Sequence, residues 1–318
     1  MQTPLDYSAD RASQRAFERA TRIFELAPAP TPRESFRRVL EYDVHVDEHL
    51  PRGPARGTVL MIHGAGAHGR MLAPFAAPLC ARGLRVLAPD LPGYGLTRGN
   101  FARTEYDEWI AIAAQLARDA ASDGPVLLFG LSVGGLTALR AAQRAPEVGG
   151  VIATTLLDLG DPGIFDRVAK YALLGRIARF AFRRAPALSD RVSLPLAWVA
   201  PLSAMTSDRA LARELIRDPL LGRRRVAMRF FRSLHGHRDP RTDFDLPCPV
   251  LLVHPGADHW TPLELSLPVF ERIGSDKTLV RLSGGAHAPL EPQAFAELDA
   301  AIGAFLERVL AVGDAAQR

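Results

Sequence analysis

The sequence predicts an α/β fold in which a mostly parallel, doubly wound sheet carries a helical insertion. Short apolar stretches typical of buried strands occur near residues 58–62, 85–89, 126–130 and 148–155. Helical patterns separate them, near residues 70–82, 104–121 and 134–145. Strands that alternate with helices favour a parallel sheet, because the chain must cross the sheet between parallel neighbours. The 318 residues, 47% of them hydrophobic, suffice for one large domain of this kind.

The first segment, residues 1–35, is expected to be a helical extension. Apolar and charged residues alternate at helical spacing over residues 8–26, and the proline-rich run at 27–32 ends the pattern. Packing on the core is favoured for this helix, with an interface or a membrane surface as alternatives. Residues 39–46 alternate as an outer strand does, so the first part of the core is expected over residues 36–159.

Residues 160–245 interrupt the alternation of strand and helix, and they are interpreted as a helical cap between the sixth and seventh strands. Their apolar residues, such as Phe165, Ile177 and Phe180, are expected mostly in the core of the cap, with some lining a substrate pocket. The outer face is expected to carry four arginines, Arg176, Arg179, Arg183 and Arg184. These form either a solvated polar face or a surface that attracts an anionic head group or a membrane.

Strand and helix return over residues 246–318, the second part of the core. Strands are expected over residues 249–254 and 278–282. The last helix shows one buried face, formed by Phe295, Leu298, Ile302, Phe305 and Leu306.

Composition narrows the function classes. The net charge of +4 comes almost entirely from scattered arginines, which suits anionic substrates or membrane surfaces, but no recognised nucleic-acid motif occurs. No apolar stretch is long enough to span a bilayer, and the first residues lack a secretory signal, so a cytoplasmic location is expected. Cys80 and Cys248 are expected to be buried thiols, with a disulfide as the alternative.

Ser132 lies in a Gly-x-Ser-x-Gly run that joins an apolar strand to a small-residue helix. A nucleophile elbow requires this context, because a sharp and strained turn must project the hydroxyl above the sheet. Gly130 and Gly134 leave room where the strand and the helix nearly touch. Ser132 is therefore the candidate nucleophile.

Two further residues complete a candidate triad. A serine hydroxyl needs a base within hydrogen-bond reach, and the base needs an orienting acceptor. His287 follows a predicted strand in an open glycine loop and is the candidate base, and Asp258 follows another strand as the orienting carboxylate. Asp158 is the rival carboxylate. All three triad residues follow the carboxyl ends of strands, where sites form in open α/β sheets.

The oxyanion of the tetrahedral intermediate needs two backbone donors. The amide of Val133, directly after the nucleophile, is the first candidate. The second is the amide of Ala65, in the small-residue loop after the strand at 58–62. His63 opens this loop and is expected to stabilise it.

The remaining histidines carry less signal. His259 lies beside Asp258 and is interpreted as incidental. His235 and His237 form a His-x-His pair in the cap, but no acidic or thiol partner follows at a suitable spacing. No metal site and no cofactor are therefore expected.

With these residues in place, the chain resembles the α/β-hydrolase superfamily over about residues 40–312, and within it the monoacylglycerol lipase and lysophospholipase-type serine hydrolases. The motifs that carry the resemblance are His63-Gly-Ala-Gly-Ala-His68, Asp90-Leu-Pro-Gly-Tyr-Gly95, Gly130-Leu-Ser-Val-Gly134-Gly135, Asp218-Pro-Leu, Gly256-Ala-Asp258 and Lys277-Thr-Leu before His287. The chain order Ser, Asp, His is also that of the superfamily. The resemblance implies an α/β-hydrolase fold, a cap that admits a long apolar chain, and hydrolysis of a carboxylic ester.

The sequence departs from this family at a few positions. Thr97 stands where the family usually has serine, and Leu131 replaces a polar residue before the nucleophile. The first 35 residues have no clear counterpart. These departures concern the substrate rather than the triad.

The leading interpretation is a cofactor-free serine esterase or lipase that acts on a small lipophilic ester through an acyl-enzyme. A thioesterase, a lactonase or a carbon–carbon bond hydrolase would use the same triad, and a perhydrolase side reaction would too. A non-catalytic binding protein with this fold is the alternative of another class, and the intact triad argues against it. Haloalkane dehalogenases and epoxide hydrolases are disfavoured because they use an aspartate where Ser132 stands. Oligomeric state is left open.

Overall fold

The structure is a computed structural model that describes residues 6–7, 18–237 and 244–316. An eight-stranded sheet forms its centre, with the spatial order β1-β2-β4-β3-β5-β6-β9-β10. The strands are β1 (Arg33–Val39), β2 (Tyr42–His49), β3 (Thr58–Ile62), β4 (Arg85–Pro89), β5 (Val126–Gly130), β6 (Val148–Ala153), β9 (Val250–His254) and β10 (Lys277–Arg281). Pairing is antiparallel from β1 through β2 to β4 and parallel from β4 to β10. The predicted doubly wound, mostly parallel sheet is confirmed.

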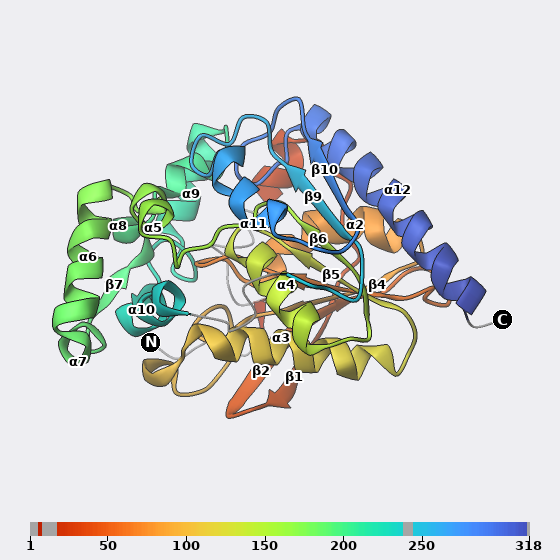
Figure 1. The fold of residues 1–318 in the computed structure, drawn as a ribbon. Coiled ribbons are helices and arrows are strands. Elements are labelled where there is room, and N and C mark those ends of the chain that lie inside the picture. Colours follow the sequence, from red (N-terminus) through yellow and green to blue (C-terminus); the bar gives the residue numbers. More distant parts are fainter. Residues whose placement is uncertain (1–5, 8–17, 238–243, 317–318) are drawn as a thin grey trace.

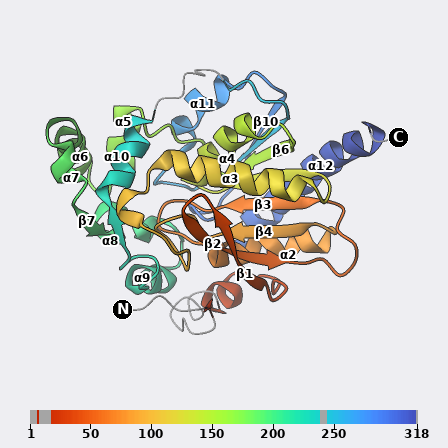
Figure 2. The ribbon, with the colours of Figure 1, turned by 90° about the horizontal axis from the view of Figure 1, so that it is seen from below.

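Helices cover both faces of this sheet (Figure 1). One face carries α3 (Tyr106–Ala121) and α4 (Val133–Arg144), and the other carries α2 (Ala73–Ala81) and α12 (Pro292–Ala316), as the view from below also shows (Figure 2). A short helix, α11 (Leu267–Glu271), follows β9. Strands covered on both faces must be apolar throughout, and every residue of β3, β5 and β9 is buried.

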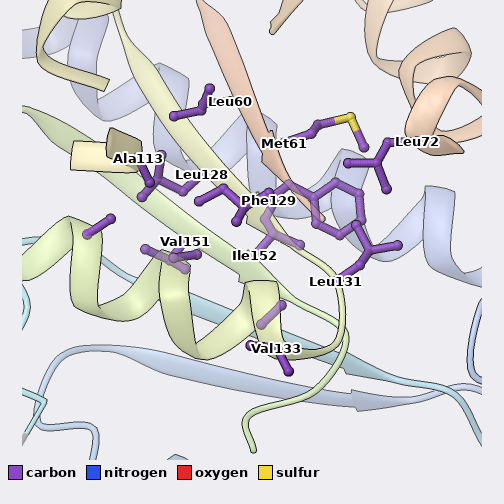
Figure 3. Close-up of a cluster of buried hydrophobic side chains, with 14 of the residues drawn as sticks. Leu60, Met61, Leu72, Ala113, Leu128, Phe129, Leu131, Val133, Val151 and Ile152 are labelled. Carbon is purple, nitrogen blue, oxygen red and sulfur yellow. The ribbon is translucent and has the colours of Figure 1, made fainter. Parts of the chain in front are cut away.

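The hydrophobic core lies where β3, β5 and β6 meet their helices. Figure 3 shows part of it around β5, where Leu128 lies near Ala113 of α3 and Phe129 lies near Leu72. Ser132 follows this strand directly, so the core fixes the base of the nucleophile loop. Cys80 and Cys248 are both buried and free, which excludes a disulfide between them.

The segment between β6 and β9 forms a helical layer beside the sheet, at the left of Figure 1. It contains α5 (Pro162–Val168), α6 (Ala172–Arg184), α7 (Pro186–Ser189), α8 (Leu196–Val199), α9 (Arg209–Arg217), α10 (Met228–Gly236) and the two-stranded sheet of β7 (Ser193–Pro195) and β8 (Arg225–Ala227). Asp161 and Asp208 cap α5 and α9 by accepting backbone N–H groups. This segment lies between the sixth and seventh strands of the sheet, β6 and β9, where the cap is expected. No helix in the described ranges is both long and apolar enough to cross a membrane.

The N-terminal part differs from the prediction. Residues 39–46 do not form one outer strand, because the chain reverses at Leu40 and β1 pairs with β2 as a hairpin. Leu40 has a φ of 52°, a turn conformation that alternating apolar residues do not reveal. The expected helix over residues 8–26 lies partly outside the described residues. Residues 18–23 are helical, and Ala20 and Phe24 are buried in the core.

The rotation of α6 also differs from the prediction. Ile177 and Phe180 were expected in the core of the cap, but they are 55% and 61% exposed. Arg179 was expected outside, but it lies inward, where its Nη2 donates to Asp166 at 2.7 Å. The close approach of α6 to α5 at Gly175 sets this rotation, because a Cβ there would lie 2.8 Å from the Cα of Asp166. This contact joins segments nine residues apart and has no periodic signal.

Candidate active site

The candidate nucleophile sits on a strained turn. Ser132 has φ 56° and ψ −130°, a conformation that non-glycine residues rarely adopt, between the end of β5 and the start of α4. A Cβ at Gly130 would lie 2.1 Å from the carbonyl oxygen of Gly134, and one at Gly134 would lie 2.1 Å from that of Ile62. The two glycines are therefore required for the tight strand–turn–helix, as the sequence pattern predicts.

Asp258 and His287 are brought together from the loops after β9 and β10. His287 Nδ1 lies 2.8 Å from Asp258 Oδ2, and both side chains are buried. Burial alone would raise the pKa of Asp258, but the contact with His287 and the hydrogen bonds from Thr261 outweigh it and hold the pKa well below its usual range. The carboxylate therefore stays ionised and accepts a hydrogen bond from the N–H of Nδ1. This leaves Nε2 as the basic nitrogen of the ring.

Two neighbours of Asp258 were missed by the sequence reasoning. Asp258 Oδ1 accepts the amides of Trp260 at 3.0 Å and Thr261 at 2.9 Å, and the Thr261 hydroxyl donates to Oδ2 at 2.6 Å. The Trp260 ring packs against His287, with centroids 4.5 Å apart, and its Nε1 donates to the carbonyl of Val168 in α5. An aspartate whose side chain accepts hydrogen bonds from the backbone N–H groups two and three residues later forms a known turn motif. The residues after Asp258 could therefore have been predicted to form this turn.

Ser132 and His287 line the same pocket. Within the described residues, no hydrogen bond joins the Ser132 hydroxyl to the His287 ring. Catalytic hydrogen bonds are often long in ligand-free enzymes and tighten when substrate binds. The three candidate residues thus meet at one place, although they are 126 and 29 positions apart in the chain, counted from Ser132 to Asp258 and from Asp258 to His287.

The two candidate oxyanion donors flank Ser132. Val133 is the first residue of α4, so its amide lies at the positive end of a twelve-residue helix. Ala65 belongs to the loop after β3, which passes so close that a Cβ at Gly64 would lie 2.7 Å from the Cβ of Ser132. Both residues line the pocket space beside the nucleophile. The placement suits backbone donors for an oxyanion.

Hydrogen bonds of the buried His63 side chain stabilise the loop that carries Ala65. His63 Nδ1 donates to the carbonyl of Gly64 at 2.8 Å, and its Nε2 accepts the amide of Leu91 at 2.9 Å. Burial lowers the pKa of His63 and keeps the ring neutral, so that one nitrogen can donate a hydrogen bond while the other accepts one. This matches the loop-stabilising part expected of His63. Thr97, one of the departures from the family pattern, accepts the amide of His45 and donates to the carbonyl of Asp90.

The rival residues lie elsewhere. Asp158 is paired with Arg272 at 3.9 Å and accepts the amide of Gly160, so it does not face His287. His259 is exposed, and His235 is bound to the carbonyl of Leu159.

One group of possible metal ligands occurs in the described residues, and it does not include the His-x-His pair. Glu34, His45 and Asp47 come within reach of one another. Arg70 already pairs with Glu34 at 2.8 Å and with Asp47 at 2.6 Å, so both carboxylates are engaged. These residues fit an ion-pair network better than a metal site.

Two pockets meet at Ser132, Ala65 and Trp260. The first encloses about 1060 Å³, counted to its open mouth, and includes polar residues such as His68, Arg70 and Asp218 beside many apolar ones. The second encloses about 810 Å³ and runs under the cap, where its walls away from the nucleophile are apolar, among them Leu159, Phe165, Ala178, Phe182, Leu196 and Phe231. The nucleophile is thus reached by a mostly apolar arm and by a mixed arm.

The sheet order, the elbow after β5 and the residues gathered above it define an α/β-hydrolase. The chain belongs to the family described as serine aminopeptidase S33 (Hydrolase_4), whose model matches residues 53–293.

The relatives with similar sequences that follow are also named as hydrolases. The chain is 40% identical over 116 residues to Lipase LipV of Mycobacterium tuberculosis, a match that covers 36% of this chain and 41% of the lipase. It therefore spans less than half the length of that relative. It is 25% identical over 235 residues, 71% of this chain and 78% of the relative, to a 2-hydroxy-6-oxononadienedioate/2-hydroxy-6-oxononatrienedioate hydrolase of Cupriavidus pinatubonensis.

Solved structures of similar fold include two lipases. The monoacylglycerol lipase of Paleococcus ferrophilus superposes with a TM-score of 0.63 at 25% identity, over 84% of this chain and 98% of that one. A soluble variant of monoglyceride lipase from Saccharomyces cerevisiae gives 0.70 at 18% identity, over 89% and 99%, a likeness that concerns the fold alone. The predicted resemblance to α/β-hydrolases of the monoacylglycerol lipase type is confirmed.

Proposed function

We propose that this protein is a serine hydrolase that cleaves carboxylic esters of lipophilic alcohols or acids through an acyl-enzyme. The observation that carries the proposal is the His287–Asp258 pair, 2.8 Å apart, beside the strained Ser132 at the junction of two pockets. Neither feature is needed for a fold alone, and a binding protein would have no use for a strained serine facing a histidine–aspartate pair.

Each residue has one part in the proposed reaction. Ser132 Oγ attacks the ester carbonyl, and its proton passes to Nε2 of His287, while Asp258 stabilises the imidazolium. The amides of Ala65 and Val133 receive the oxyanion, a pair of donors of which each is worth about 3 kcal/mol in the transition state. The alcohol leaves with the proton from His287, and water, activated by the same ring, then releases the acid. No cofactor takes part in this scheme.

The pockets support a lipophilic substrate. Apart from Ser132 and Thr261, the residues that line the arm under the cap are apolar, so this arm favours an alkyl or acyl chain. The other arm, with His68, Arg70 and Asp218 on its wall, suits a shorter or more polar portion of the ester. A monoacylglycerol-like ester has this division between a long apolar part and a polar part.

Carbon–carbon bond hydrolysis is less well supported, although one relative is named as a hydrolase of an oxo-dioate. A dicarboxylate substrate would need a cation that is free to bind it. Of the described residues that line the two pockets, Arg70 is the only lysine or arginine, and Asp47 and Glu34 already hold it.

Peptide cleavage from a free amino terminus, which the family description names, would need an acidic group for the ammonium. Asp218 lines the first pocket, but its Oδ1 accepts the amide of Leu220 at 2.7 Å. Ester hydrolysis makes no such demand. Thioesters and lactones remain substrates to compare with esters in the assay below.

The test is covalent labelling followed by a substrate series. A fluorophosphonate probe is expected to add once to the intact protein and not to Ser132→Ala, measured by mass spectrometry. p-Nitrophenyl esters of rising chain length should then be cleaved fastest at medium or long chains, because the apolar arm gains about 0.8 kcal/mol per buried methylene. Labelling of a folded Ser132→Ala variant would refute the assignment of the nucleophile. Labelling with little ester turnover would instead favour thioesters, lactones or carbon–carbon bonds.

A further inference from the structure

The outer face of α6 is apolar where a helix of this kind is normally polar. Leu173, Ile177 and Phe180 follow one another at spacings of four and three, so they form one stripe along the helix. They are 65%, 55% and 61% exposed, whereas the buried residues Gly175 and Phe182 lie on the opposite side. Exposed apolar side chains are ordinary when single, but a stripe of three on one helix calls for a partner.

Elements next to α6 also expose large side chains. The amide of Lys170 donates to the carbonyl of Val199 at 2.8 Å, which brings the start of α6 beside the end of α8. Three further large side chains are more than half exposed: Tyr171 directly before α6, Leu188 in α7 and Trp198 in α8. We call the six residues the cap patch: Tyr171, Leu173, Ile177, Phe180, Leu188 and Trp198. Figure 1 shows α6 and α7 at the edge of the molecule farthest from α12.

The surroundings of the cap patch are basic. Residues 162–200 contain seven lysines and arginines and two aspartates. Both aspartates are already paired, Asp166 with Arg179 and Asp190 with Arg232.

Two arginines lie on the patch itself. Arg184 continues the stripe one turn beyond Phe180, with its guanidinium 5.9 Å from that ring, and Arg183 is exposed beside it. Neither forms an ion pair with any residue that the structure describes. Apolar side chains bordered by free cations, with tyrosine and tryptophan at one end, match the interface between lipid tails and anionic head groups.

We propose that the cap patch docks on an anionic lipid surface. A second copy of this chain is the competing occupant, but a symmetric contact would press this basic patch against an identical basic patch of the other copy. That arrangement brings like charges together, whereas a phosphatidylglycerol or similar surface neutralises them. The charge around the patch therefore selects the membrane over self-association.

The patch also meets the proposed active site. Leu174, which is 43% exposed, follows Leu173 on α6 and lines the apolar arm that leads to Ser132. Docking would therefore set the apolar arm next to the lipid phase, from which a lipophilic ester can enter without crossing water. This last step rests on the proposed function, whereas docking itself does not.

The test is vesicle sedimentation in the Ser132→Ala background, so that lipid is not consumed and binding is separate from turnover. Vesicles of phosphatidylcholine are compared with vesicles that also contain phosphatidylglycerol. One variant replaces the stripe, as Leu173→Ser/Ile177→Ser/Phe180→Ser, and another reverses the charge, as Arg183→Glu/Arg184→Glu. The control is Leu40→Ser/Leu279→Ser, which removes two exposed leucines, 56% and 37% accessible, outside the patch.

The parent protein is expected to prefer the anionic vesicles. Each patch variant should lower the apparent partition coefficient at least about tenfold, and the control should leave it unchanged. Circular dichroism melting verifies that each variant is folded. Absence of binding to anionic vesicles would overturn the proposal, as would equal binding by the parent and both folded variants. A dimer in lipid-free solution that only the stripe variant dissociates would overturn it in favour of self-association.

Discussion

Replacing Asp258 with asparagine tests how His287 is oriented. Asp258 Oδ1 accepts two backbone amides, from Trp260 and Thr261, and an asparagine keeps both bonds only if its carbonyl oxygen takes that position. Its NH₂ group then replaces Oδ2, which lies 2.8 Å from His287 Nδ1. An N–H donor at this place requires an unprotonated Nδ1, so the proton moves to Nε2.

The expected cost follows from that tautomer. With Nε2 protonated, the ring no longer accepts the proton of Ser132, and no carboxylate stabilises the imidazolium. A change of this kind lowers kcat by about 10⁴-fold, or about 5.5 kcal/mol of transition-state stabilisation. The Asp158→Asn variant is the control, because that side chain pairs with Arg272 and does not contact His287.

The assay is the pre-steady-state rate of p-nitrophenol release, together with the labelling rate by the fluorophosphonate probe, in both variants. Asp258→Asn should lose both while its circular dichroism spectrum stays that of the parent, and Asp158→Asn should keep both. If Asp158→Asn were the more damaging change, or if Asp258→Asn lost less than about tenfold, the choice of carboxylate would be wrong.

Three further changes test other parts of the structure. Gly134→Ala should lower the free energy of unfolding by about 1–3 kcal/mol and abolish labelling, because its Cβ would lie 2.1 Å from the Ile62 carbonyl; Gly149→Ala, with its nearest neighbours at 3.7 Å, is the control in urea unfolding. Ala178→Phe should narrow the apolar arm and lower kcat/KM for p-nitrophenyl laurate about tenfold while sparing the acetate, and an equal loss for both esters would argue against an alkyl chain in that arm. Tyr7→Phe removes the hydroxyl that donates to buried Asp90 at 2.7 Å and should cost about 1.5–3 kcal/mol at neutral pH. Burial alone would raise the pKa of Asp90, but His45 and backbone amides hold it below its usual range, so this contribution is present above the ordinary aspartate pKa of about 4 and is lost as the pH falls through the folded value. A difference in unfolding free energy between the parent and the Tyr7→Phe variant that is as large in acid as at neutral pH would contradict this account.

Some expectations were correct because their cause is local. An apolar strand, a glycine on each side of Ser132 and a small-residue helix lie within one short run, and steric contact between neighbours dictates the turn whatever surrounds it. Strand and helix alternation likewise determines a parallel sheet, because each buried strand must be covered on both faces. The resemblance to α/β-hydrolases followed from the order of these local motifs.

Other features depend on contacts between distant segments, and the sequence did not determine them. The reversal at Leu40 and the rotation of α6 are decided by pairing with β2 and by the close contact of Gly175 with Asp166, neither of which alters the hydrophobic period. The amphipathic pattern of α6 can be recognised in the sequence, but such a pattern does not tell which face of the helix packs on the protein and which face is exposed. Tertiary structure decided that, because burial is a property of what packs against a residue and not of the residue itself.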